Sequence, residues 1–126
     1  MAVSTERIYN SDWLAWEQEN DFSREKVTIG VSQTIIKGEV LAIVTATGHY
    51  AAFNQDNVPA GTNAPRGIAL GDYTTGAGAT VQGAAIVRDA IVIEGKLTFP
   101  SDIEAAEQVT AMAALKTLGI IARQEV

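Results

Sequence analysis

The stretch from Val40 to Thr45 constrains the fold more than any other part of the chain. It reads VLAIVT, so both of its faces are apolar, and the run is too short for a typical buried helix. This pattern predicts a central β-strand with a neighbour on each side. Thr47-Gly48 then predicts a tight turn, and Tyr50–Phe53 predicts a strand that returns beside the first as its hairpin partner.

The rest of the region from residue 27 to residue 99 alternates short apolar runs with turn-forming residues. Asn54–Arg66 contains two prolines among Asn, Asp and Gly and predicts a loop, and Thr74–Thr80 (TTGAGAT) predicts a second, flexible loop. Short strands with frequent turns predict a mainly β fold with a small α part (α+β), barrel-like or sandwich-like. Further strands are expected at Val27–Ile29, at Ile35-Ile36 before a turn at Lys37-Gly38, at Gly67–Leu70, at Ala84–Arg88 and at Ala90–Glu94.

The spacing of apolar residues changes after Pro100. Ser101 is placed to cap a helix, and Glu104 is placed to complete a capping box. We therefore predict a helix over residues 102–118 that ends at Gly119, followed by a closing strand at Ile120–Arg123. The residues expected near its apolar face are Ile103, Ala106, Val109 or Thr110, Ala113 and Leu118.

The first 26 residues are polar and acidic but contain both tryptophans of the chain. Ser11 or Asp12 is a candidate cap for a short helix in which Trp13 and Trp16 share a face. We predict an N-terminal arm over residues 1–26, with this short helical piece, and a single β-rich domain over residues 27–126. The two tryptophans either contact a partner or pack against the protein's own core, and the sequence favours neither alternative.

The composition argues against several classes of protein. The chain of 126 residues has a net charge of −6 and no basic cluster, which argues against nucleic-acid binding. It has no cysteine, which excludes disulfides, thiolate metal sites and cysteine nucleophiles. We expect no signal peptide, because the first residues lack an apolar core, and no membrane span, because no apolar run approaches ~20 residues.

Groups that could carry out catalysis are sparse. His49 is the only histidine and lies at a predicted turn, where an exposed, non-catalytic histidine is expected. Glu39, Asp72, Asp89 and Glu94 are spaced singly through the β region, with no indicated pairing. We therefore predict that the protein is not an enzyme and uses no metal or cofactor.

A carrier domain is the alternative that the sequence leaves open. The stretch KGEVLAIVTATG is similar to the strand that leads into the hairpin of biotinyl and lipoyl carrier domains. In those domains the hairpin tip presents a lysine for cofactor attachment, whereas here the tip is Thr45–His49 and the nearest lysine, Lys37, precedes the strand. A β-rich carrier or small-ligand-binding domain is therefore the alternative function.

Five segments occur in a characteristic order along the chain. They are SREKVTIG (residues 23–30), KGEVLAIVTATGHY (37–50), PRGIALGDY (65–73), AIVRDAIVIEGKLTF (85–99) and MAALKTLGIIAR (112–123). Their order and spacing resemble the head decoration proteins of tailed phages, the lambda-type capsid-stabilising protein D family. The resemblance covers nearly the whole chain from Ser23, and the upstream segment DWLAWEQENDFSRE is similar to the longer-armed members.

The resemblance implies a fold, an assembly and a location. It implies a compact β-clip- or β-tulip-like barrel domain with one C-terminal helix and an extended N-terminal arm. It also implies a homotrimer that binds the major capsid protein on the outer surface of the expanded capsid and cements the head. Before assembly, the protein is expected in the host cytoplasm. No cofactor, nucleic acid or membrane is implied as a partner.

Two sets of contact residues are expected from this resemblance. Aromatic anchors and β-branched residues suited to strand addition are candidates for capsid binding. Residues in predicted loops and turns are candidates for trimer contacts, because loops commonly carry binding functions. The capsid-binding candidates are Ile8, Tyr9, Trp13, Leu14, Trp16, Val27, Thr28 and Ile29, and the trimer candidates are Pro65, Arg66, Gly67, Asp72 and Tyr73.

Overall fold

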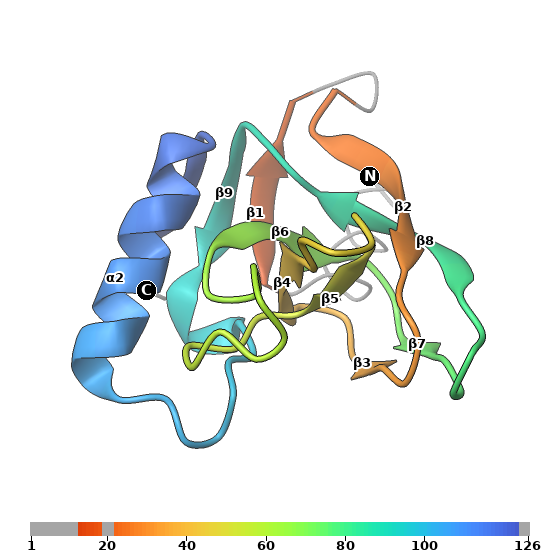
Figure 1. The fold of residues 1–126 in the computed structure, drawn as a ribbon. Helices are drawn as coiled ribbons and strands as arrows, with labels where there is room; N and C mark the ends of the chain where they lie inside the picture. Colours follow the sequence, from red (N-terminus) through yellow and green to blue (C-terminus); the bar gives the residue numbers. More distant parts are fainter. Residues whose placement is uncertain (1–12, 19–21, 124–126) are drawn as a thin grey trace.

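The computed structural model describes residues 13–18 and 22–123 and contains three β-sheets and one α-helix in that part of the chain (Figure 1). Five strands close into a barrel in the order β2-β5-β4-β6-β8, which confirms the predicted β-rich, barrel-like α+β fold. A three-stranded sheet, β1-β9-β10, and a two-stranded sheet, β3-β7, complete the fold. The strands are β1 (Leu14–Glu17), β2 (Arg24–Ile29), β3 (Thr34–Ile35), β4 (Val40–Ile43), β5 (Tyr50–Ala52), β6 (Pro65–Ala69), β7 (Tyr73–Thr74), β8 (Val81–Ile86), β9 (Ala90–Ile93) and β10 (Ile120–Arg123).

Strand β4 has a neighbouring strand on each side in the barrel, as its apolar sequence predicts. It pairs antiparallel with β5 on one side and with β6 on the other. Leu41 and Ala42 are fully buried because side chains on both faces of the strand meet other apolar residues. The hairpin predicted between β4 and β5 is present, and Gly48 adopts the positive φ of +73° that its turn requires.

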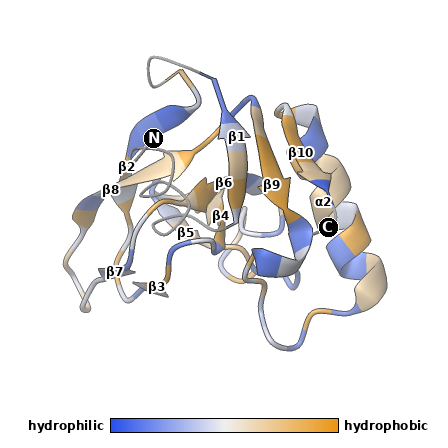
Figure 2. Ribbon diagram, turned by 180° about the vertical axis from the view of Figure 1, so that it is seen from behind, coloured by the Kyte–Doolittle hydropathy of each residue, from blue (hydrophilic) through white to orange (hydrophobic). Residues whose placement is uncertain are grey.

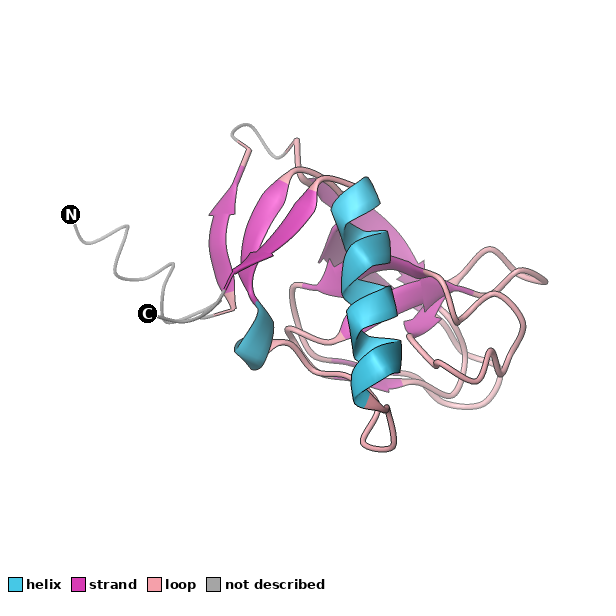
Figure 3. Cartoon of the chain, turned by 90° about the vertical axis from the view of Figure 1, so that its left-hand side faces the viewer, coloured by secondary structure: helices cyan, strands magenta, loops and turns pink. Residues whose placement is uncertain are grey.

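The helix α2 (Ala105–Thr117) covers one side of the molecule beside the three-stranded sheet (Figure 3). It ends as predicted, because Gly119 adopts a φ of +85° and the chain continues directly into β10, which runs parallel to β9. A 3-10 turn, η1 (Glu94–Lys96), follows β9. No helix in the described part of the chain is long and apolar enough to span a membrane.

The predicted start of the helix is wrong by three residues. The helix begins at Ala105 rather than at 102, and Glu104 rather than Ser101 is its cap. The capping box is formed by Glu104 with Glu107, one turn later than expected. Ser101 instead lies in a turn that is closed by a hydrogen bond from the Ile103 amide to the Pro100 carbonyl, 3.1 Å.

The predicted apolar face of the helix is also wrong in part. Ala111 and Leu115 are the buried residues, with Met112 and Leu118 packed beside them against the core. This set follows the i, i+4, i+7 spacing of one helical face. The residues expected on the face that are exposed instead are Ala106, Val109, Thr110 and Ala113.

The predicted short helix around the tryptophans is wrong. Residues Leu14–Glu17 form strand β1, which pairs antiparallel with β9. The Trp13 carbonyl accepts a hydrogen bond from the Ile93 amide at 2.7 Å, so the pairing begins before the strand itself. Because β9 offers a free edge, strand pairing determines the local conformation here, and β1 and the start of β2 lie on the arm side of the boundary predicted at residue 26.

The main hydrophobic core joins the barrel, the three-stranded sheet and the helix. Trp13 is 2% exposed and lies in this cluster. Its indole packs directly on Gly38, where an added Cβ would lie 2.9 Å from the indole Cδ1 and where φ is +88°. The other buried members of this cluster are Leu14, Val40, Phe53, Ile68, Ile86, Ala90, Val92, Ala111, Leu115 and Ile120.

Trp13→Ala is expected to lower the free energy of unfolding by about 3–5 kcal/mol, because it leaves a large cavity where three elements meet. The matched control is Trp16→Ala, which is expected to change it by less than about 1 kcal/mol because Trp16 is 48% exposed. Urea unfolding of both variants measures the difference. Equal losses of stability would contradict this account of the core.

Candidate functional site

The outer face of the three-stranded sheet carries a row of large apolar side chains. Trp16 of β1 is paired with Ile91 of β9, and Ile91 is paired with Ile121 of β10. Trp16 is 48% exposed and Ile121 is 44% exposed, while Ile91 between them is half-buried. We call Trp16, Ile91 and Ile121 the apolar row. The hydropathy colouring in Figure 2 shows hydrophobic residues along β9 and β10 of this sheet.

Strand alternation explains how the same sheet serves both the core and the surface. Val92 is buried and its neighbour Ile91 points the other way, because successive side chains alternate between faces. The pairing of β1 shifts register between Leu14 and Trp16. This irregularity leaves Leu14 buried and Trp16 exposed although they are two residues apart.

The chain enters and leaves this sheet at the same end. Strand β1 runs antiparallel to β9, whereas β10 runs parallel to it. The first residue of β1, Leu14, pairs with Val92, and the last residue of β10, Arg123, pairs with Ile93. Leu14 and Arg123 therefore lie at the same end of the sheet.

A network of polar contacts fixes the end of β1 and the start of β2 beside the sheet. Arg24 donates two hydrogen bonds to the Glu17 carboxylate, at 2.7 and 2.6 Å. Ser23 is fully buried, and its hydroxyl donates to the Asp89 carbonyl at 2.6 Å and accepts from the Gln18 amide at 2.9 Å. Bidentate and buried contacts of this kind hold the position of a strand more firmly than single exposed ion pairs do.

A further aromatic group lies at the end of this segment. Phe22 is 50% exposed, and the guanidinium carbon of Arg88 lies 5.3 Å from the centre of its ring. Arg88 also donates to the Phe22 carbonyl and pairs with the Glu25 carboxylate. The cation above the ring and these two bonds hold Phe22 at the surface.

The structure divides the capsid-binding candidates into buried and exposed residues. Trp13, Leu14, Val27 and Ile29 have exposures of 2%, 8%, 5% and 0%, so their side chains belong to the two hydrophobic clusters of the core. Trp16 is exposed and Thr28 is half-buried. Ile8 and Tyr9 lie outside the described residues. The segment Glu25–Ile29 is part of β2 and pairs with β8 of the same chain.

The trimer candidates lie in two places. Pro65 and Arg66 are in strand β6 rather than in the predicted loop, Gly67 is in this strand as predicted, and only Arg66 of the three is exposed. The carboxylate of Asp72 accepts a hydrogen bond from the Lys37 amide at 2.8 Å, and Tyr73 is in strand β7. Asp72 therefore fixes the turn that precedes β4.

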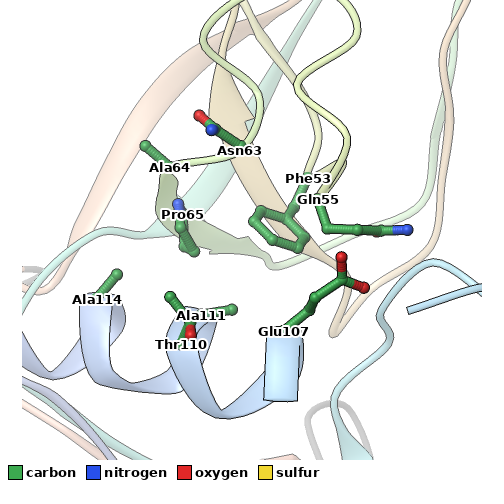
Figure 4. Close-up of a pocket in the computed structure, with 9 residues that line it drawn as sticks. All are labelled: Phe53, Gln55, Asn63, Ala64, Pro65, Glu107, Thr110, Ala111 and Ala114. Carbon is green, nitrogen blue, oxygen red and sulfur yellow. The ribbon is translucent and has the colours of Figure 1, made fainter. Parts of the chain in front are cut away.

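A groove that sequence reasoning missed lies between α2 and the segment of residues 53–65 (Figure 4). Its volume is about 320 Å³. One sequence signal was available, because the helix sequence AAEQVTAMAALKT has apolar or small residues on all of its faces. We call this cavity the α2 groove, and its lining residues are Phe53, Gln55, Asn63, Ala64, Pro65, Glu107, Thr110, Ala111 and Ala114.

The groups considered for chemistry stay dispersed. Within residues 13–18 and 22–123, no three His, Asp or Glu side chains are grouped to hold a metal ion. His49 is half-buried at the β4–β5 turn, and its amide donates to the Thr47 hydroxyl at 3.2 Å. The tip of this hairpin carries no lysine, so it lacks the attachment residue of a carrier domain.

The fold and these surfaces define a small β-barrel protein with an exposed apolar row on its three-stranded sheet. The family model of the bacteriophage lambda head decoration protein D matches residues 3–120. The chain belongs to this head decoration family, whose members are structural proteins of the phage capsid rather than enzymes. Membership implies association with the capsid in the virion. A search of curated proteins found no match to the chain.

Glu39, in the turn before β4, provides a test of electrostatics at this turn. Burial raises the pKa of its carboxyl group, and the hydrogen bond that it accepts from the Ile36 amide opposes this rise. The folded state therefore keeps the proton to a higher pH than the unfolded chain does. Stability contributed by the protonated form is present at acidic pH and is lost as the pH rises through the folded pKa.

Glu39→Gln is expected to raise the melting temperature at pH 7, because the neutral amide oxygen still accepts from Ile36 without a buried charge. The gain is expected to shrink as the pH falls through the raised folded-state pKa and to be absent below about pH 4.3, the pKa of an unperturbed Glu. Melting temperatures of the variant and the wild type between pH 3.5 and 7.5 measure this difference. Asp56→Asn, at an exposed loop position, is the control. A gain in melting temperature that is independent of pH would contradict a raised pKa at Glu39.

Proposed function

We propose that this protein binds the outer surface of the expanded phage head as a homotrimer and cements neighbouring major capsid subunits. Membership of the head decoration family and the dispersed arrangement of its titratable groups support this proposal. A protein with this role needs complementary surface and symmetry, and neither catalysis nor a cofactor is part of it. The chain would be made in the host cytoplasm and would join the head after expansion.

The observation that carries the proposal is the apolar row on the three-stranded sheet. Exposed tryptophan and isoleucine side chains in one row form the kind of anchor that contributes most binding energy in protein interfaces. We propose that the apolar row is the centre of the capsid contact. Residues 1–12, which include Ile8 and Tyr9, precede the strand that carries Trp16 and are proposed to extend the contact over the capsid.

A trimer strengthens this attachment through linkage. Once one copy is bound, the contacts of the other two become effectively intramolecular, and avidity can exceed single-site affinity by about 10²–10⁴. Each sheet face can therefore make a modest contact while the assembly remains attached under internal DNA pressure. The same trimer would bridge several capsid subunits, which is what stabilises the shell.

Trp16→Ala and Ile121→Ser are each expected to lower affinity for expanded heads that lack the protein by about tenfold or more, with unfolding free energy nearly unchanged. Quantitative add-back of purified protein to such heads measures the affinity. Val81→Ala is the matched control, because Val81 is 38% exposed on β8 of the barrel, away from the apolar row. Wild-type occupancy by both row variants would contradict the proposed face.

Removal of residues 1–12 is expected to leave the fold intact and to reduce capsid occupancy. The deletion must stop before Trp13, because removing residues 1–22 would also remove β1 and the largest side chain of the core. Circular dichroism and thermal melting check the fold, and the same add-back assay measures occupancy. Full occupancy by the shortened protein would rule out a role for these residues in attachment.

A further inference from the structure

The exposed face of α2 has the composition of an interface. Between Glu107 and Lys116 the helix carries no charged residue, and Val109 on its outer side is 67% exposed. A helix that is apolar on all faces is normally buried. The exposed residues that give α2 this character are Ala105, Ala106, Val109, Thr110 and Ala113.

The α2 groove lies next to this face, and the chemistry of its lining indicates which side chains could fill it. Phe53, Pro65, Ala111 and Ala114 give it an apolar lining. No lysine or arginine occurs in residues 53–65 or 107–114, the segments that supply its lining residues. A side chain that fills the groove should therefore be aliphatic and adjacent to a cation. The acidic wall consists of Glu107, which lines the groove, and Asp102 at its edge, whose carboxylate accepts a hydrogen bond from the Gln55 side chain at 3.0 Å.

The turn of residues 36–39 presents such a combination on the same chain. Ile36 is 48% exposed, and Lys37 next to it is also exposed. The turn is held by hydrogen bonds from the Lys37 amide to Asp72 at 2.8 Å, from the Ile36 amide to Glu39 at 3.1 Å and from the Gly38 amide to the Ala69 carbonyl at 2.9 Å. A turn that is fixed in advance loses little conformational entropy when it binds.

Within one chain, neither Ile36 nor Lys37 is among the residues that line the groove. In both Figure 1 and Figure 2, α2 lies at one side of the molecule and β3, which leads into the turn, lies toward the other. Two complementary but different patches on one chain form a heterologous contact. Repeated head to tail, such a contact closes into a ring when the rotation between copies allows it.

We propose that Ile36 and Lys37 of one copy insert into the α2 groove of a second copy, with Ile36 against Ala111 and Ala114 and Lys37 facing the acidic wall. This inference rests on the proposed homotrimer and assigns its contact surfaces. It leaves the apolar row free for the capsid. It also gives two of the earlier trimer candidates a place, since Pro65 lines the groove and Asp72 fixes the turn.

The absence of cysteine from the chain allows a direct test. Ile36→Cys and Thr110→Cys are combined in one chain, because both positions are exposed and lie on opposite sides of the proposed contact. Mild oxidation is expected to produce covalent dimers and trimers on non-reducing gels, since a disulfide requires Cα atoms within about 4.4–6.8 Å. The matched control pairs Val31→Cys with Thr110→Cys, because Val31 is 45% exposed outside the turn.

Three outcomes of the cross-linking would overturn the inference. The Val31 control could cross-link as efficiently as the Ile36 pair, or Ile36→Cys alone could form dimers, which would indicate a symmetric contact. The Ile36 and Thr110 pair could also fail to cross-link while sedimentation shows a trimer. In each case the capsid-binding function stands. A wild-type protein that sediments as a monomer at all concentrations would remove the trimer itself, and add-back to heads would still test capsid binding separately.

A charge reversal gives a second readout. Lys37→Glu is expected to weaken trimer association by tenfold or more, because it places a carboxylate against the acidic wall of the groove. Lys26→Glu is the control, since Lys26 is exposed on β2 and the change in net charge is the same. Sedimentation over a range of concentrations measures both variants. Equal weakening by the two variants would contradict a specific role for Lys37.

Discussion

The packing of Trp13 on Gly38 is the contact on which the rest of the structure depends. It joins the first strand of the three-stranded sheet to the turn before the central barrel strand. The glycine is required because its φ is positive and because a Cβ would overlap the indole ring. Among residues 13–18 and 22–123 the buried indole nitrogen has no hydrogen-bond partner, a cost that the apolar contacts of the ring must offset.

This one contact positions both proposed interaction surfaces. On one side of Trp13, the chain continues into β1 and sets the exposure of Trp16 on the outer face of the sheet. On the other side, Gly38 belongs to the turn that presents Ile36 and Lys37. The core is therefore also the rigid connection between a face proposed for the capsid and a turn proposed for the neighbouring copy.

The sequence predicts the barrel well because short-range patterns determine it. The run at Val40–Thr45, the turn at Gly48 and the cap at Gly119 each match the structure, since two-sided apolarity and positive-φ glycines have direct structural consequences. The helix start was misplaced because Ser101 and Glu104 satisfy the spacing of a capping box, while Glu104 and Glu107 form the actual one. These two possible capping boxes overlap in the sequence. The turn closed by the Pro100 carbonyl and the Ile103 amide, which is seen only in the structure, decides between them.

The candidate site was harder to predict because it depends on distant pairing. Trp13 and Trp16 lie in the same short segment, so the local sequence does not distinguish them. The register with β9 and the irregularity after Leu14 make Trp13 buried and Trp16 exposed. The α2 groove likewise requires the segment 53–65 to fold over the helix. Neither arrangement is encoded in the local sequence that a pattern search reads.

The topology also has a consequence for the order in which the protein is made. Every strand of the barrel is complete once Ile86 has been synthesised, whereas the three-stranded sheet pairs Leu14 with Val92 and adds β10 after the helix. A nascent chain can therefore close its barrel while the sheet face is still incomplete. The apolar row proposed to recognise the shell is the last surface to be completed, because it needs both Ile91 and Ile121.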